Sequence, residues 1–307
     1  AAYKHLMMNR RPIIRKDDLI AGTTTTKEIG VVLYPDTHGT MIWGELLSAR
    51  HRALNPYEIS DKTRRILHSD VFPFWEKRNA REWTRHRHGN PLCQQLDERF
   101  AVYFLWKTAA VSHTIPDFPK LLHLGADGIV AELRESIAAE DCGEEKRATL
   151  EAMAECLEGV VAYAENLSAK AAADAKVESG PARAYELERL SEICARVPRL
   201  PARTLDEAVN SLWISWVALH MENTNAGLSL GRLDQALQPF FEADMSKLED
   251  AAERDAYLRR AIELVGCFYM RCADHLPLIP DIGNFLFGGS SSDQAITLGG
   301  LTPDGKS

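Results

Sequence analysis

The stretch TLDEAVNSLWISWVALHM, residues 204–221, decides the fold class of this chain. Thr204 and Glu207 stand in the pattern Thr-x-x-Glu, a capping box in which the two side chains satisfy backbone N–H groups at the start of a helix. Apolar residues then follow in an almost unbroken run. The stretch predicts a long helix from Leu205 to about Glu222, and the patterns on either side of it are mainly helical as well.

Two further helices are predicted upstream. Apolar residues recur at helical spacing over residues 150–171 while Glu, Lys and Asp take the opposite face. This pattern indicates an amphipathic helix that begins near Glu144 and ends at about Gly180. Pro181 then opens a second helix, at a position where its missing N–H group costs little, and Pro198 ends it.

The N-terminal part of the chain divides into two stretches. Thr, Gly and Pro punctuate residues 1–43, which favours a strand and loops over helix. Residues 44–112 turn to helical patterns, with a short helix expected after Ser60. Within them LDERFAVYFLWKTAAVSH, which starts at Leu96, is apolar on nearly every face. A helix that is apolar all round is a buried one.

Strand signals stand downstream of the decisive stretch. LSLGRLDQ, residues 228–235, alternates as a short strand and runs into a glycine turn, and a helix that carries Leu258 and Phe268 follows. A second strand is expected over Ala295–Leu298, among turns rich in Gly and Ser. Because no strand follows it, we expect this strand to lack a partner within the chain.

The composition narrows the class of protein. The chain has 307 residues, of which 45% are hydrophobic and 26% charged, as in ordinary globular proteins. A formal net charge of −8 argues against nucleic acid as the main partner. The apolar stretches are far shorter than the roughly 20 residues of a transmembrane helix, and the N-terminus lacks the apolar region of a secretory signal.

The six cysteines are scattered and form no C-x-x-C pair or zinc-ligand spacing. Free thiols, most of them buried, are typical of such a set in a reducing compartment. We therefore expect a cytoplasmic protein with no metal site.

Polar residues in a rigid turn are the first candidates for a functional site. His113 and Asp117 stand in a segment with two prolines, where such side chains can handle protons or bind a polar substrate. The structural alternative is that Asp117 caps a helix starting near Phe118 and that His113 is a hydrogen-bonded core histidine. The spacing leaves both interpretations open.

Two other turns carry candidates. Ser290 and Ser291 follow two glycines, and their hydroxyl and backbone N–H groups are suited to gripping an anion such as a carboxylate, although an exposed flexible loop has the same composition. Arg232 and Asp234 stand at a strand-to-helix turn, where Arg232 can bind a carboxylate and Asp234 can cap the helix at Gln235. A purely structural salt bridge and cap is the alternative.

Three stretches together resemble one family: YKHLMMNRRPIIRKDDLIAGTTTTKEIGVVLYPD at 3–36, LSLGRLDQALQPFFEADM at 228–245 and ITLGGLTPDG at 296–305. They are similar to the pyruvate formate-lyase-like glycyl radical enzymes. The resemblance implies an α/β fold in which helices surround a ten-stranded barrel. Residues 1–307 would be the N-terminal, mainly helical portion of that fold, with the first barrel strands near their C-terminal end.

The resemblance also implies a chemistry. In this family an S-adenosylmethionine-dependent activating enzyme installs a protein glycyl radical, which passes to a cysteine thiol. Both loops are expected downstream of Ser307, so we expect no catalytic residue and no bound cofactor in this chain, and no activity from it alone.

Within the family, VFPFWEKRNAREW at 71–83 and FGGSSSDQAITLGG at 287–300 look most like arylacetate decarboxylases, which convert 4-hydroxyphenylacetate, phenylacetate or indoleacetate into a methyl arene and carbon dioxide. Carried over to this sequence, Ser290 and Ser291 hold the substrate carboxylate and His113 lies on the substrate side of the pocket.

In this reading Asp117, Arg232 and Asp234 support the pocket. The expected partners are the activating enzyme, a small aromatic acid, further copies of the chain and, as a candidate, a small iron–sulfur subunit. Membranes and nucleic acids are not expected. Two alternatives stay open: another glycyl radical lyase or dehydratase, acting on a diol, a choline-like amine or a sulfonate, and a non-catalytic helical binding remnant.

Overall fold

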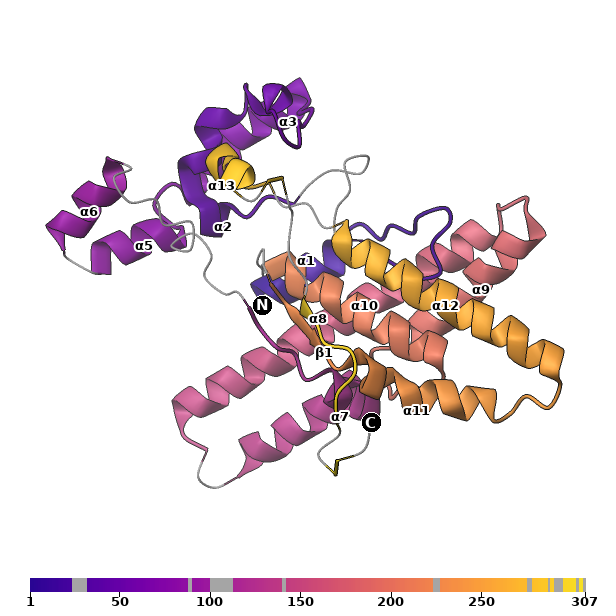
Figure 1. The fold of residues 1–307 in the computed structure, drawn as a ribbon. Coiled ribbons are helices and arrows are strands. Elements are labelled where there is room, and N and C mark those ends of the chain that lie inside the picture. The colour runs from indigo at the N-terminus through magenta and orange to yellow at the C-terminus, as the bar shows by residue number, and fades with distance from the viewer. Residues whose placement is uncertain are drawn as a thin grey trace.

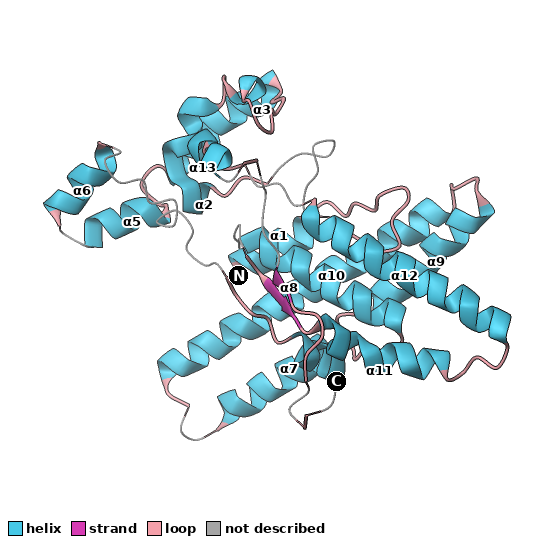
Figure 2. Cartoon of the chain, in the orientation of Figure 1, coloured by secondary structure: helices cyan, strands magenta, loops and turns pink. Residues whose placement is uncertain are grey.

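The computed structural model describes residues 1–23, 32–87, 90–99, 113–139, 142–222, 227–274, 278–286, 288–289, 295–301 and 304–305. Helices dominate these residues (Figures 1 and 2). The helices are α1 (Ala2–Asn9), α2 (Pro35–His38), α3 (Asp61–Ile66), α4 (Phe72–Trp75), α5 (Ala80–Arg87), α6 (Pro91–Glu98), α7 (Phe118–Ala138), α8 (Glu144–Ala175), α9 (Pro181–Arg196), α10 (Leu205–Glu222), α11 (Leu233–Met245), α12 (Ala251–Ala273) and α13 (Asp281–Leu286). Shorter turns of helix span Gly39–Glu45, Ala49–His51 and Leu67–Val71, and the strands are β1 (Ser229–Gly231) and β2 (Ala295–Ile296).

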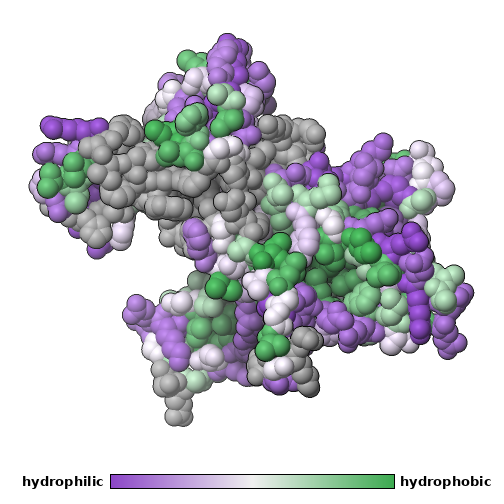
Figure 3. All heavy atoms as spheres, in the orientation of Figure 1, coloured by the Kyte–Doolittle hydropathy of each residue, from purple (hydrophilic) through white to green (hydrophobic). Residues whose placement is uncertain are grey.

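Helix α10 lies at the centre of the main core, where α7, α8, α9, α11 and α12 pack against it. The rings of Trp213 and Trp216 stack with their centroids 5.0 Å apart, and both side chains are buried. Burying a large apolar side chain contributes roughly 2–3 kcal/mol. Figure 3 shows that, on the viewed face, apolar residues gather over α10 and β1, whereas hydrophilic residues lie on the outer helices.

The predicted start of α10 is confirmed. One of the two hydrogen bonds of its cap differs from that of the expected capping box. The hydroxyl oxygen of Thr204 accepts a hydrogen bond from the N–H of Glu207 at 3.2 Å. The carboxylate of Glu207 accepts its backbone hydrogen bond from Arg203, one residue before the cap, at 2.7 Å. The side chain of Arg203 reinforces this contact at 2.6 Å. Glu207 therefore fixes the approach to the helix as well as its first turn.

The two helices predicted upstream are confirmed as α8 and α9, with one boundary moved. Helix α8 ends at Ala175 instead of Gly180, because the carboxylate of Glu178 accepts the N–H of Gly180 at 2.8 Å and closes a turn between the helices. Pro181 is the first residue of α9, as expected. The expected buried helix from Leu96 falls largely on residues 100–112, which lie outside the described residues.

Helix α7 is broken inside its length by Gly125, which has φ 66° and ψ 171°. The backbone of the loop after α9 enters the break: the N–H of Ala126 donates to Pro198 at 2.8 Å and that of Asp127 to Arg199 at 3.0 Å. A Cβ atom at position 125 would lie 2.5 Å from the carbonyl oxygen of Arg199. Only glycine combines this conformation with so close an approach.

A second, smaller core forms a body beside the bundle, built from α2, α3, α4 and the short helices around them. Ile42, Leu46 and Phe72 are buried in it, together with Leu278 from far along the chain. Helix α13 lies in this body between α2 and α3 (Figure 1). The N-terminal and C-terminal parts of the described chain therefore share one core.

The expectation of a strand and loops over residues 1–43 is wrong for much of the described part. Residues 2–9 form α1, and Pro35 opens α2, which a 3₁₀ helix over Gly39–Glu45 continues. Proline fits the first turn of a helix, and the acidic Asp36 beside it stabilises that helix end. Residues 24–31, within the expected strand, lie outside the described residues.

The strands β1 and β2 pair in parallel, with Ser229 opposite Ala295. The expectation that the second strand lacks a partner is therefore wrong: its partner precedes it in the chain, and α11, α12 and α13 lie in the connection between them. A parallel pair requires such a long connection, which the helical pattern supplies.

Candidate functional site

The predicted site residues His113, Arg232 and Asp234 lie close to the parallel ladder. The N–H of Ser229 donates to the carbonyl oxygen of Thr114 at 2.9 Å, so the segment before α7 lies along β1. On the ladder itself, the N–H of Ala295 donates to Leu228 at 3.0 Å and that of Thr297 to Gly231 at 3.2 Å. The structure thus brings the His113 segment, the Arg232 turn and the segment after β2 into one place.

His113 lies at the start of this arrangement. It is exposed, so the interpretation of a core histidine is wrong, and its φ of 56° places it in the left-handed region. Its ring lies against Gly227, where an added Cβ atom would be 2.7 Å from His113 Cδ2. Since Gly227 itself has φ 72°, a side chain there is disfavoured twice, and the close approach of the imidazole to the turn before β1 depends on that glycine.

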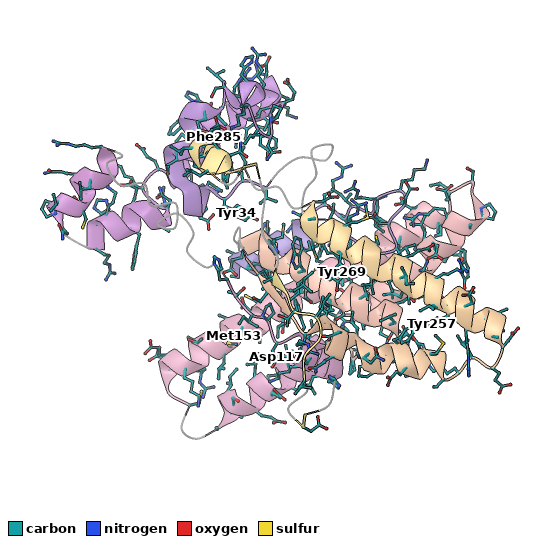
Figure 4. All side chains as sticks on the ribbon, viewed as in Figure 1. Tyr34, Asp117, Met153, Tyr257, Tyr269 and Phe285 are labelled. Atoms are coloured by element: carbon teal, nitrogen blue, oxygen red, sulfur yellow. The ribbon has the colours of Figure 1, made fainter. Side chains whose placement is uncertain are left out.

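Asp117 has the structural role that the sequence offered as an alternative. Its carboxylate Oδ1 accepts the N–H of Lys120 at 3.0 Å and so caps α7. The residue also borders an apolar pocket of about 800 Å³ between α7, α8 and α10. Met153 of α8 lines the same pocket, and Figure 4 shows both side chains on neighbouring helices. Asp117 thus lies at the edge of a hollow whose walls are mostly aliphatic.

Arg232 and Asp234 form a two-pronged ion pair, with Nε to Oδ1 and Nη2 to Oδ2 both at 2.8 Å. Asp234 Oδ2 also accepts the N–H of Gly299 at 3.0 Å. The guanidinium of Arg232, followed by the N–H groups of Gly299 and Gln235, holds the pKa of the Asp234 carboxyl well below its usual range. Asp234 is the second residue of α11 and therefore lies inside the helix it was expected to cap.

The Arg232–Asp234 pair constrains the backbone at the ends of both strands. The Arg232–Asp234 pair ties the turn after β1 to the backbone that leaves β2, so the two strand ends keep a fixed relation. A charge-assisted, bidentate pair has a more definite geometry than a single contact.

Ser290 and Ser291 lie outside the described residues, but the glycines directly before them are described. Gly289 donates its N–H to the carbonyl oxygen of Asn284 at 2.8 Å. Its own carbonyl oxygen accepts a hydrogen bond from the side-chain amide of Asn55 at 2.6 Å. Asn55 was not among the predicted site residues, although the dipeptide Asn55-Pro56 is a turn signal that could have indicated it.

The six cysteines are all free, as expected, but they are not mostly buried: Cys93 and Cys156 are exposed, and Cys194 and Cys272 are buried. Burial raises the pKa of the Cys194 thiol to about 12 and raises that of Cys272 further. Both buried thiols therefore stay protonated and unreactive at neutral pH.

Membrane-spanning helices and clusters of metal ligands are both absent from the described residues. Across these ranges, no helix has both the length and the apolar character needed to cross a membrane. In the same part of the chain, no three or more His, Cys, Asp or Glu side chains come together as ligands for a metal ion.

Comparison with known proteins gives consistent results. The family model described as pyruvate formate lyase-like matches residues 1–307. Isethionate sulfite-lyase of Nitratidesulfovibrio vulgaris is 31% identical, over 99% of this chain and 38% of its own length. Indoleacetate decarboxylase of Tractidigestivibacter scatoligenes is 22% identical, over 98% of this chain and 37% of its own.

Among solved structures, hydroxyproline dehydratase from Clostridioides difficile, with trans-4-hydroxy-L-proline bound, superposes with a TM-score of 0.85 at 26% identity. The match covers 99% of this chain and 38% of that one. The chain thus spans less than two fifths of the length of these relatives. The expected fold class, the mainly helical N-terminal portion of a glycyl radical enzyme, is confirmed, and the chain belongs to the pyruvate formate-lyase-like family of glycyl radical enzymes.

Proposed function

We propose that this chain is the N-terminal part of a glycyl radical lyase that eliminates a small leaving group, sulfite or water, from a small polar substrate with a hydroxyl or amino group on the neighbouring carbon. The observation that carries the proposal is the 31% identity to an isethionate sulfite-lyase over 99% of the chain. The likeness to hydroxyproline dehydratase supports the same class, because both reactions cleave a bond to a heteroatom.

The chain's own residues are proposed to bind and orient the substrate. Ser290 and Ser291 offer hydroxyl groups to a sulfonate or carboxylate, and His113 is a further candidate hydrogen-bond partner. Neutral donors suit an anionic group whose bonding changes during the reaction. A strong ion pair would stabilise the bound substrate in its ground state and so would not lower the barrier. The radical chemistry itself would come from a cysteine and a glycine outside these 307 residues, after activation by an S-adenosylmethionine-dependent enzyme.

Arylacetate decarboxylation is the second candidate, and the observation in its favour is the indoleacetate decarboxylase relative. The identity of the chain to this relative, 22%, is lower than its identity to the sulfite-lyase. Decarboxylation is therefore a weaker candidate than elimination. A small iron–sulfur subunit, assembly with further copies and a cytoplasmic location stay predictions of the resemblance.

The test is a product assay on the full-length protein, obtained by reading the coding sequence past Ser307 and activated anaerobically with its activating enzyme. Isethionate, trans-4-hydroxy-L-proline, glycerol and indoleacetate are supplied separately, and sulfite, dehydrated product and carbon dioxide are measured. Release of sulfite or a dehydrated product supports elimination. Carbon dioxide from indoleacetate, with no product from the other three, overturns it in favour of decarboxylation.

A control omits the activating enzyme and must give no product. Ser290→Ala and Ser291→Ala are compared with the wild type for binding of the substrate found active. Unchanged affinity in both variants contradicts their proposed role, even if the product assay supports elimination.

A further inference from the structure

The apolar pocket of about 800 Å³ between α7, α8 and α10 is open at its rim, and we call it the α7–α8 groove. Its floor is aliphatic and includes the buried side chains of Leu121, Val160 and Ala218. Met153 on α8, labelled in Figure 4, lies at the rim with its side chain 50% exposed. Apolar side chains that displaced water from such a hollow would gain free energy, so the groove favours an apolar occupant.

The charges on the rim of the groove are acidic in balance. Lys120 forms an ion pair with Glu132 at 2.5 Å, so these two charges offset each other. Asp117 and the exposed Glu222 add two carboxylates. Burial, followed by the charge of Glu222, raises the pKa of the Tyr3 hydroxyl, which shows that this carboxylate lies close to the groove lining. The occupant that fits is apolar in its centre and basic at one edge.

The later part of the chain leaves the described structure close to this groove. The strand β2 pairs with β1, and the N–H of Ser229 on β1 donates to the carbonyl oxygen of Thr114 at 2.9 Å. Pro116, in the same segment as Thr114, lines the groove. Two apolar side chains of this region are exposed: Ile115 is 75% exposed and Leu298, after β2, is 66% exposed. Polypeptide that follows β2 therefore starts beside the groove, next to uncovered apolar surface.

The relatives indicate how much polypeptide is available to cover the groove. The chain matches the N-terminal portion of these proteins and spans 38% of isethionate sulfite-lyase, so more than half of such a protein follows. A segment on the same polypeptide has an effective concentration on the order of millimolar, whereas a second copy or a separate partner binds from dilute solution. A connected segment is therefore the favoured occupant.

We propose that the α7–α8 groove is the docking site for a segment of the same polypeptide that follows Ser307 in the full-length protein. The segment inserts apolar side chains between α7 and α8 and turns a basic side chain towards Glu222. The inference rests on the proposed function only in that both require polypeptide after Ser307, and it involves neither substrate nor radical.

Cys156 can report whether the groove is covered, because it lines the groove and is exposed in the described chain. The full-length, unactivated protein is treated with iodoacetamide, and the exposed Cys93 on α6 is the reference thiol. Under a docked segment, Cys156 should react about a hundredfold more slowly than Cys93. A Cys156 that reacts as fast as Cys93 shows an open groove and overturns the inference.

A substitution at the rim tests whether slow labelling comes from a docked segment. Met153→Gln removes an apolar contact without adding charge, so it should let the segment open more often and raise the labelling rate of Cys156 about tenfold. Burial raises the pKa of the Cys156 thiol, but this effect cancels when one thiol is compared in two variants. Met270→Gln, at a 64% exposed position of α12, is the matched control and should leave the rate unchanged. An unchanged rate in Met153→Gln contradicts a docked segment.

Photocrosslinking identifies the occupant directly. Benzoylphenylalanine is placed at position 153, and at position 270 as control, in a mixture of isotope-labelled and unlabelled copies of the full-length protein. A peptide from beyond Ser307, joined to position 153 within one copy and absent from the control, supports the inference. A peptide from a differently labelled copy identifies a second copy as the occupant and overturns it. Crosslinks only to residues 1–307 overturn it as well.

The crosslink and the product assay can fail separately. A crosslink to a segment beyond Ser307, found in a protein that gives no elimination product, overturns the proposed function alone. An elimination product, found together with a crosslink to a second copy, overturns the docking of the later segment alone.

Discussion

Tyr34 donates a hydrogen bond from its hydroxyl group to the backbone carbonyl oxygen of His220, although 186 residues separate them in the chain. Both residues are buried, and Figure 4 shows Tyr34 at the junction between the small body and the bundle. Burial raises the pKa of the tyrosine hydroxyl far above its usual range, so it remains a donor at every practical pH. This contact joins the segment before α2 to the last turn of α10.

Replacing Tyr34 by Phe should lower the free energy of unfolding by about 1–3 kcal/mol, because a buried carbonyl oxygen loses its donor while the ring stays in place. Urea unfolding of the chain measures this. Tyr185→Phe is the control, since Tyr185 is 59% exposed and should lose nothing measurable. Equal effects of the two substitutions would contradict the assigned role of Tyr34.

His220 should make stability depend on pH. Burial lowers its pKa from 6.5 to about 4, and its Nδ1–H donates to the carbonyl oxygen of Trp216 at 2.8 Å. Between these two values the unfolded chain binds a proton that the folded chain does not. The stabilisation is therefore complete above pH 6.5 and is lost as the pH falls towards 4, by about 3 kcal/mol in total.

The measurement compares unfolding free energies of wild type and His220→Asn from pH 7 to pH 4. The wild type should lose about 3 kcal/mol more than the variant over this range, because carboxylates titrate equally in both. His123→Asn, at an exposed position of α7, serves as control and should follow the wild type. Parallel curves for wild type and His220→Asn would show that the imidazole does not titrate in this way.

Two glycine substitutions should have opposite signs. Gly125→Ala is expected to cost about 3 kcal/mol or more, since position 125 has a conformation open almost only to glycine and the added carbon meets the Arg199 carbonyl oxygen. Gly266→Ala in α12 meets nothing within 4 Å and should stabilise the helix by about 0.5–1 kcal/mol. Thermal unfolding distinguishes them, and a stabilising Gly125→Ala would contradict the break in α7.

The ion pair between Arg232 and Asp234 should show its own pH limit. Since the pKa of Asp234 is lowered, its stabilising contribution is present above about pH 4, the value for an unperturbed carboxyl, and disappears in stronger acid. Asp234→Asn should therefore lower the melting temperature at pH 7 and lower it by less at pH 2. Asp255→Asn removes the exposed pair with Arg259 and should have no effect at either pH.

The helices were predictable because their information is local. The cap at Thr204, the proline at 181 and the apolar stripe of α8 each act within a few residues, and each is where the sequence indicated. The break in α7 was not predictable, because it depends on the backbone of Arg199 entering from another part of the chain. The pairing of β1 with β2 was not predicted either, because it also depends on segments that are far apart in the chain.

The candidate site shows the same limit. Arg232 and Asp234 are neighbours in sequence and could be assigned as a pair, whereas Asn55 meets Gly289 across 234 residues. The family was evident from short motifs, since these reflect how helices and strands pack. The substrate class was not evident, because a few pocket side chains decide it. Identity over the whole chain favours elimination instead.

The shared small core has a consequence for the order of events on the ribosome. Residues 42–72 emerge early. The side chain of Leu278 and the hydrogen bond from Asn284 to the carbonyl oxygen of Leu54 reach them only after the bundle helices have been synthesised. Contacts across such separations form late, because the intervening chain must first be brought together. The apolar side chains of the nascent small body therefore stay exposed to solvent until these later residues have been synthesised. Exposed apolar side chains of this kind favour aggregation and chaperone binding during translation.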